Sequence, residues 1–106
     1  MEMQDLLESS LESVWKSQVI HKNYKVYEVD LSVAHTDLEI GLKDSGIIAE
    51  GLIVVQADSA VYFKLNAPKN DLIPAFQNLK IENFEIREIY VTNSAATGKL
   101  KIMLIW

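Results

Sequence analysis

Two histidines, His21 and His35, are the residues that could most readily bind a metal ion or transfer a proton, and both lie next to predicted turns. A zinc site needs three or four clustered ligands, and a chain without cysteine could add only a carboxylate such as Asp37. A single His-Thr-Asp stretch does not make such a cluster. We therefore expect both histidines to be ordinary surface or strand-end residues, with no metal site and no cofactor.

Oxygen-bearing side chains are a second source of chemistry. Asp58, Asn66, Asn70 and Asp71 lie in predicted loops and could hold calcium, but they lack the alternating spacing of an EF-hand and suit turns. Calcium binding is therefore left open. The serines have no G-x-S-x-G elbow and no histidine partner, and the glycines are isolated, so no nucleophile or phosphate loop is found. This pattern predicts a protein that is not an enzyme.

Aromatic side chains could form a platform for stacking sugars. The candidates are Trp15, Tyr24, Tyr27, Tyr62, Tyr90 and Trp106. Aromatic residues on strands more often cover a core or fill a subunit contact, and nothing gathers these residues with Asn, Asp and Gln on one loop face. We favour core and contact roles and keep sugar binding as an alternative.

The charge and composition exclude several classes of protein. The net charge is -5, from 15 acidic and 10 basic residues, and no two Lys or Arg residues are adjacent. Binding to nucleic-acid phosphates normally needs a clustered basic surface, so we expect no binding of DNA or RNA. No apolar segment approaches the ~20 residues that span a bilayer, and the acidic N-terminus is unlike a secretory signal. We expect a soluble protein with one hydrophobic core, made in a cytoplasm.

Residues 3–18 form the one predicted helix. Leu7, Leu11, Val14 and Trp15 repeat at the spacing of a single helical face, and acidic residues gather in the first turns, as the helix dipole favours. We therefore divide the chain into an N-terminal helical arm, residues 1–20, and a β-domain, residues 21–106. The apolar stripe either packs on the domain's own sheet or docks on a neighbouring copy or larger assembly.

The rest of the chain shows the period of two that is typical of strands. Strands are predicted at 24–33, 38–43, 47–56, 60–66, 89–92 and 99–106, with a turn at 35–37 and weaker strand patterns between 72 and 86. Turn residues predict hairpins at 47–66 and 89–106. About seven or eight short strands indicate an all-β, jelly-roll-like antiparallel β-sandwich.

The final run, residues 99–106, changes character along its length. Its first part alternates apolar residues with lysines, but Met103 and Ile105 then make both faces apolar. Such a strand starts half exposed and ends covered on both sides. We predict partner or oligomer contacts here and on the helix, at Leu7, Leu11, Val14, Trp15, Met103, Ile105 and Trp106.

From residue 29 onward, the β-domain resembles small β-sandwich proteins in the virions of tailed bacteriophages. The marks of the resemblance are VDLS (29–32) with Ala34, VYFKLN (61–66), LIP (72–74), the strand around Phe84, IYVTN (89–93), a small-residue loop closing on Gly98 and Lys99, and the terminal apolar strand. These are loose structural signatures, and they contain no catalytic residue. The N-terminal helix lies outside the resemblance.

The resemblance implies a non-enzymatic structural protein of a phage virion, as a capsid decoration, head-fibre, collar or tail-associated component. Its partners are then further copies of itself, with a trimer among the forms considered, and other virion proteins. A surface glycan is a further partner left open. The protein is expected to be made in the host cytoplasm and to act in the virion. The alternative is a carbohydrate- or host-receptor-binding β-sandwich module that uses loop Asn and Asp residues with exposed tyrosines such as Tyr62 and Tyr90.

Overall fold

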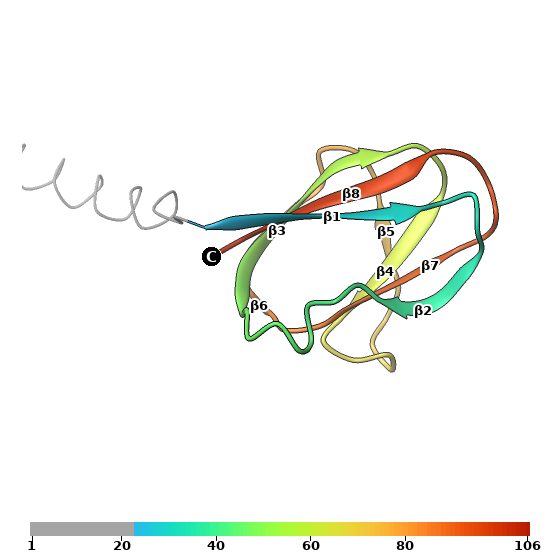
Figure 1. Ribbon diagram of the computed structural model, residues 1–106. Coiled ribbons are helices and arrows are strands. Elements are labelled where there is room, and N and C mark those ends of the chain that lie inside the picture. The colour runs from blue at the N-terminus through green and yellow to red at the C-terminus, as the bar shows by residue number, and fades with distance from the viewer. Residues whose placement is uncertain (1–22) are drawn as a thin grey trace, which may run out of the picture.

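Most successive strands of the chain lie in different sheets of a pair of antiparallel sheets (Figure 1). The computed structural model describes residues 23–106, within which there are eight strands and no helix. The strands are β1 (Tyr24–Asp30), β2 (His35–Glu39), β3 (Ala49–Ala57), β4 (Val61–Leu65), β5 (Ile73–Ala75), β6 (Lys80–Ile86), β7 (Ile89–Asn93) and β8 (Lys99–Ile105). One sheet has the order β1-β8-β3-β6 and the other β2-β7-β4-β5. The predicted all-β sandwich is confirmed.

Most connections between the strands cross from one sheet to the other. Only β4 and β5 follow each other in sequence and also pair, with Val61 opposite Ala75. The predicted hairpins at 47–66 and 89–106 are therefore wrong, because β3 and β4 lie in different sheets, as do β7 and β8. The turn residues between these strands reverse the chain as expected. The two strands of each pair instead lie in different sheets, and each buries its apolar face in the core between them.

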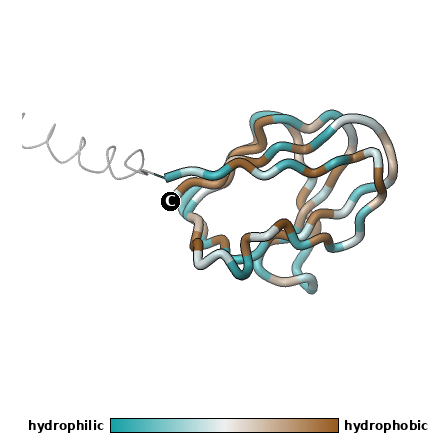
Figure 2. Tube along the Cα trace, viewed as in Figure 1, coloured by the Kyte–Doolittle hydropathy of each residue, from teal (hydrophilic) through white to brown (hydrophobic). Residues whose placement is uncertain are grey.

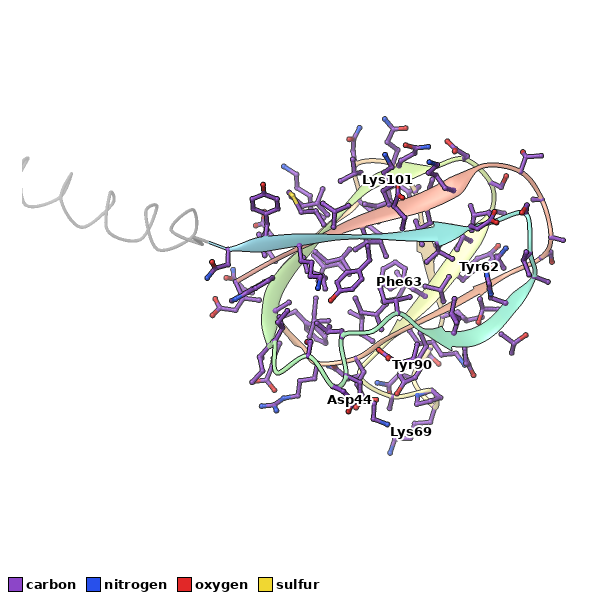
Figure 3. The ribbon with its side chains drawn as sticks, in the orientation of Figure 1. Asp44, Tyr62, Phe63, Lys69, Tyr90 and Lys101 are labelled. Carbon is purple, nitrogen blue, oxygen red and sulfur yellow. The ribbon has the colours of Figure 1, made fainter. Side chains whose placement is uncertain are left out.

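The core lies between the sheets and is made by the inward-facing residues of each strand. Successive side chains of a strand point to opposite faces, so every second residue is buried, as Leu100, Ile102 and Leu104 of β8 are. Phe63 of β4 is fully buried from the other sheet (Figure 3). Figure 2 shows the alternation of hydrophobic and hydrophilic residues along the strands. Each large side chain buried in this way stabilises the fold by about 1.5–3 kcal/mol.

The first and last strands lie side by side in one sheet. β1 pairs with β8 along its whole length, from Tyr24 opposite Ile105 to Asp30 opposite Lys99. The ladder continues past the strands, because Asn23 and Trp106 exchange two backbone hydrogen bonds of 3.1 Å. On its other side β8 pairs with β3. The final apolar run is therefore a central strand, as its sequence pattern indicates.

The start of β2 differs from the sequence prediction. Residues 35–37, predicted to form a turn, begin this strand, and the strand predicted at 38–43 already ends at Glu39. Asp37 has a φ of 50° and the register with β7 shifts here, so a bulge admits turn-type residues into the ladder. The strand ends because the Glu39 carboxylate accepts hydrogen bonds from the backbone N–H groups of residues 41–43, at 3.0, 3.1 and 3.2 Å.

The predicted helix, residues 3–18, and the arm at 1–20 lie outside the described residues. Both the helix and the proposed division of the chain stay predictions. In the part of the chain that the structure describes, there is no helix long and apolar enough to cross a bilayer.

Candidate interaction surface

The outer face of the β1-β8-β3-β6 sheet is divided into a charged half and an apolar half. The residues of this face alternate with the buried ones, and strand register sets them in rows across the sheet. The first row contains Val26, Met103, Ile53 and Lys80, and the second contains Tyr24, Ile105, Gly51 and Glu82. We use the name apolar half-face for the members of these rows on β1, β8 and β3, namely Tyr24, Val26, Gly51, Ile53, Met103 and Ile105.

The side chains of the apolar half-face are exposed on β1 and half-buried on β8 and at Ile53 of β3. Tyr24 and Val26 are 70% and 45% exposed, and the Ile53, Met103 and Ile105 side chains are half-buried. Gly51 permits close packing here, since a Cβ atom at this position would lie 3.0 Å from Cγ1 of Ile105. The absence of a side chain on Gly51 lets Ile105 lie across β3. The result is a continuous apolar surface over three neighbouring strands.

The charged half of the same face is already internally paired. Lys101 and Lys99 on β8 approach the Glu28 carboxylate on β1, with Nζ–Oε1 distances of 3.3 and 3.7 Å. The Asp58 carboxylate accepts a hydrogen bond from the backbone N–H of Lys99, at 2.9 Å, and another from the Gln56 amide, at 2.7 Å. These two bonds hold the pKa of Asp58 below its ordinary value. This half can remain in water with its charges satisfied.

Two unpaired charges border the apolar half-face on β6. Lys80 lies opposite Ile53 and Glu82 lies opposite Gly51, so the two charges end successive rows. Both side chains are exposed, and neither makes an ion pair with another residue of the described part of the chain. The border therefore offers one positive and one negative group in a fixed order.

Two of the predicted contact residues, Met103 and Ile105, lie at the centre of the apolar half-face. Trp106 follows them and is partly buried against the core, so its role in a contact stays a prediction. The four helix residues predicted as contacts, Leu7, Leu11, Val14 and Trp15, lie outside the described residues, and their role stays a prediction too.

The part of this surface that comes from β1, β3 and β6 was not predicted from the sequence. Tyr24 and Val26 were available as a signal, because they alternate along β1. That signal was ambiguous, since the strand has β-forming residues on both faces. The positions on β3 and β6 become neighbours of Met103 only through pairing between distant strands, which no local pattern reveals.

A hollow of about 640 Å³ lies on the outer face of the other sheet, where β2 begins and β7 ends. It is lined by Ala34, His35, Thr36, Ala60, Tyr62, Leu72, Thr92, Asn93, Ser94 and Ala95. Tyr62, named in the alternative sugar-binding prediction, is 41% exposed here (Figure 3). Tyr90, the second tyrosine named there, is buried and donates its hydroxyl to the Glu88 carboxylate, so its ring is not free to stack on a ligand.

The other polar residues singled out in the sequence hold turns together. Asn66 accepts a hydrogen bond from the backbone N–H of Arg87 at 2.7 Å, and Asn70 donates one to a loop carbonyl at 2.6 Å. With the bonds of Asp58, these contacts confirm the turn-forming interpretation for three of the four loop residues. Within residues 23–106, no group of three or more His, Asp or Glu residues could hold a metal ion.

Comparisons with known proteins give little beyond the architecture. No family model matches the chain. No curated protein matches it either. Among solved structures, the chain is similar to an RmlC-like cupin protein from Desulfovibrio desulfuricans, with 14% sequence identity over 78% of this chain and 72% of that chain, and a TM-score of 0.46. A likeness of this size defines neither a ligand nor an activity for the chain.

The predicted function in a phage virion is wrong. The similar solved structure is a cupin, and neither family models nor curated proteins connect the chain with a capsid, head fibre, collar or tail. The signatures that carried the resemblance, such as residues 61–66 and 89–93, form β4 and β7 of an ordinary sandwich. Strand patterns of this kind recur in proteins of unrelated function. The expectations of no enzymatic activity, no nucleic acid and no membrane partner stay predictions.

Proposed function

We propose that this β-sandwich is a self-association domain, in which the apolar half-face of one copy is covered by that of a second copy. The observation that carries the proposal is the order of residues in the two rows of the β1-β8-β3-β6 sheet. Each row has apolar residues over three strands and a charge at the β6 end, and the two charges are opposite. A surface of this kind is complementary to itself.

The complementarity follows from a twofold axis that crosses the strands midway between the rows. Such an axis places the first row of one copy over the second row of the other, as an isologous contact requires. Met103 then faces Ile105 of the second copy, and Val26 faces Tyr24. At the border, Lys80 faces Glu82 in both symmetry-related positions. Packed sheets cross at about 30°, an offset that long Lys and Glu side chains can span.

Several partly exposed side chains share the energy of the contact. Covering the open half of a Val, Ile, Met or Tyr side chain contributes on the order of 1 kcal/mol. Association itself costs about 4–15 kcal/mol in lost freedom of motion. The gain from the apolar half-face is therefore of the same order as this cost. We expect self-association that depends on protein concentration and that one unfavourable substitution can abolish.

We also assign the sandwich to the jelly-roll class. The support is the strand order, since β1, β8, β3 and β6 form one sheet and β2, β7, β4 and β5 the other, with most connections crossing between them. This order belongs to folds made of two interleaved four-stranded units. The assignment concerns the fold alone.

The test is the mass of the full chain in solution. Sedimentation equilibrium over a wide concentration range is expected to show a dimer that dissociates on dilution. Met103→Asp, which puts a charge at the centre of the contact, is expected to give a monomer with an unchanged circular dichroism spectrum. Val33→Asp is the matched control, because Val33 is also exposed, at 54%, but lies outside the apolar half-face.

A wild-type chain that is monomeric at every concentration refutes the proposal. It is refuted as well if the mass of the Met103→Asp variant equals that of the wild type while both remain folded. If Val33→Asp dissociates the assembly as completely as Met103→Asp, the contact lies elsewhere on the domain.

A further inference from the structure

The hollow formed by β2, β4 and β7 has the chemistry of a ligand site. We propose that it binds a neutral, hydroxyl-rich ligand of the size of a small saccharide. Its volume of about 640 Å³ lies within the range of about 300–1,000 Å³ that is usual for sites of small molecules. The hollow lies on the sheet opposite the apolar half-face, so the inference goes beyond self-association and does not depend on it.

Three hydroxyl groups lie in this hollow without partners among the described residues. Within residues 23–106, the hydroxyls of Thr36, Tyr62 and Ser94 make no hydrogen bond. The hydroxyls of Ser45 and Ser59, which lie outside the hollow, each donate to a backbone carbonyl at 2.6 Å. Each free hydroxyl can donate one hydrogen bond and accept others. Three such groups in one hollow match a ligand that is itself rich in hydroxyls.

One further side chain, His35, adds a hydrogen-bond acceptor to the lining, and Asn93 is held in place by its own hydrogen bonds. Nε2 of His35 lies 3.0 Å from the carbonyl oxygen of Asp30, and a carbonyl can only accept, so Nε2 carries the hydrogen. In the neutral ring, Nδ1 is then an acceptor. Asn93 is 6% exposed, and its amide nitrogen donates to backbone carbonyls, including that of Val33 at 3.1 Å. Its Oδ1 is buried without a partner among the described residues.

The lining residues also indicate the charge of the ligand. None of the ten residues that line the hollow is Asp, Glu, Lys or Arg. Asp37, which follows Thr36 in the sequence, is paired with Lys64 through a 3.1 Å contact. Phosphates and carboxylates are bound through Arg, Lys or several backbone N–H groups. The hollow therefore favours a neutral ligand over an anionic one.

An apolar surface completes the match to a saccharide. The Tyr62 ring projects from β4 at 41% exposure, and Leu72 and three alanines line the same hollow. A pyranose ring has a face of C–H groups that packs on an aromatic ring, with its hydroxyls around the edge. Tyr62 can receive the C–H face while the free hydroxyls of the lining bind the edge.

The test is a titration of the full, isotopically labelled chain with methyl glucoside, methyl galactoside, methyl mannoside, maltose and lactose, followed by NMR chemical shifts of backbone amides. We expect at least one of these neutral saccharides to shift amides of the hollow. Tyr62→Ala is expected to weaken binding about tenfold, and Tyr62→Phe to retain most of it, because the ring is kept. Phe76→Ala is the matched control, since Phe76 is 56% exposed and lies outside the hollow.

Three results would overturn the inference. The first is that none of the five saccharides shifts the amides of the hollow at the highest soluble concentration. The second is that Tyr62→Ala and Phe76→Ala weaken binding equally. The third is that glucose 6-phosphate binds more tightly than the neutral saccharides. The Tyr62→Ala variant should form the same assembly in solution as the wild type. A failure of saccharide binding is therefore distinguishable from a failure of self-association.

Discussion

Reversing the charge of Lys80 gives the sharpest test of how two copies meet. In the proposed contact, Lys80 of each copy faces Glu82 of the other, so the dimer contains this pair twice. Lys80→Glu replaces both attractions by repulsions. The two residues are exposed and end successive rows of one sheet. The substitution should therefore change association while leaving the fold intact.

The magnitude follows from the number of pairs. An exposed ion pair contributes about 0.2–1 kcal/mol, and a like-charged pair is unfavourable by a similar amount. Each of the two pairs loses an attraction of about 0.5 kcal/mol and gains a repulsion of about 0.5 kcal/mol. The dimer is therefore destabilised by about 2 kcal/mol in total. This corresponds to a dissociation constant roughly 30-fold higher. Repulsion between positions 80 and 82 within one copy is present in monomer and dimer alike, so it largely cancels.

The assay is sedimentation equilibrium at low and high salt. Lys80→Glu and Glu82→Lys should each weaken the dimer, and the double reversal should restore it, because each copy again offers both charges in complementary order. The difference in dissociation constant between the single variants and the wild type should shrink at about 1 M salt, where the screening length is about 3 Å. Lys69→Glu is the control, since Lys69 lies in the β4–β5 connection, away from this sheet (Figure 3). If the double reversal binds no better than the single variants, the proposed pairing is refuted.

Two further predictions concern the fold itself. Gly98→Ala should lower the free energy of unfolding by about 2–4 kcal/mol in urea denaturation, because Gly98 has a φ of 82° and a Cβ atom there would lie 2.2 Å from Cβ of Asp58. Gly46→Ala, with a φ of 79° and open space around it, should lower it by only about 1–2 kcal/mol; equal losses would contradict the argument from close approach. The hydrogen bond to Glu88, with burial, raises the pKa of Tyr90 to about 12 from an ordinary 10.0. Because the folded state favours the neutral phenol, this stabilisation is present below pH 10 and is lost as the pH rises through about 12. Tyrosinate absorbance should therefore show a tyrosine that titrates near pH 12 and that Glu88→Gln shifts to lower pH, and no change on that substitution would disprove the assignment.

The all-β architecture could be predicted because a strand with one buried face alternates apolar residues with others along the sequence. The alternation of Leu100, Ile102 and Leu104 with other residues identifies the inward face of β8. The doubly apolar end of the same strand singled out Met103 and Ile105, which the structure places on the outer face of the sheet. Their role in a contact stays a prediction. The predicted hairpins failed for a physical reason. A turn residue such as Asp58 bends the chain but does not specify whether the next strand pairs with the last one or crosses the core.

The two surfaces were harder to predict because distant segments build them. The row through Met103 joins β1, β8, β3 and β6, and only strand register makes these neighbours. The hollow around Tyr62 similarly joins the start of β2 to the end of β7. Tyr62 and Tyr90 were equal candidates for a ligand contact, because composition alone does not show which tyrosine is buried. Both tyrosines lie on strands, and only packing decides which ring faces solvent.

The pairing of β1 with β8 sets the order in which this domain can be assembled during synthesis. Tyr24 is opposite Ile105, a sequence separation of 81 residues, because 105 - 24 = 81. During synthesis, β1 must therefore wait for β8 before the ladder between them can form. Domains dominated by such distant contacts fold slowly, typically in milliseconds to seconds.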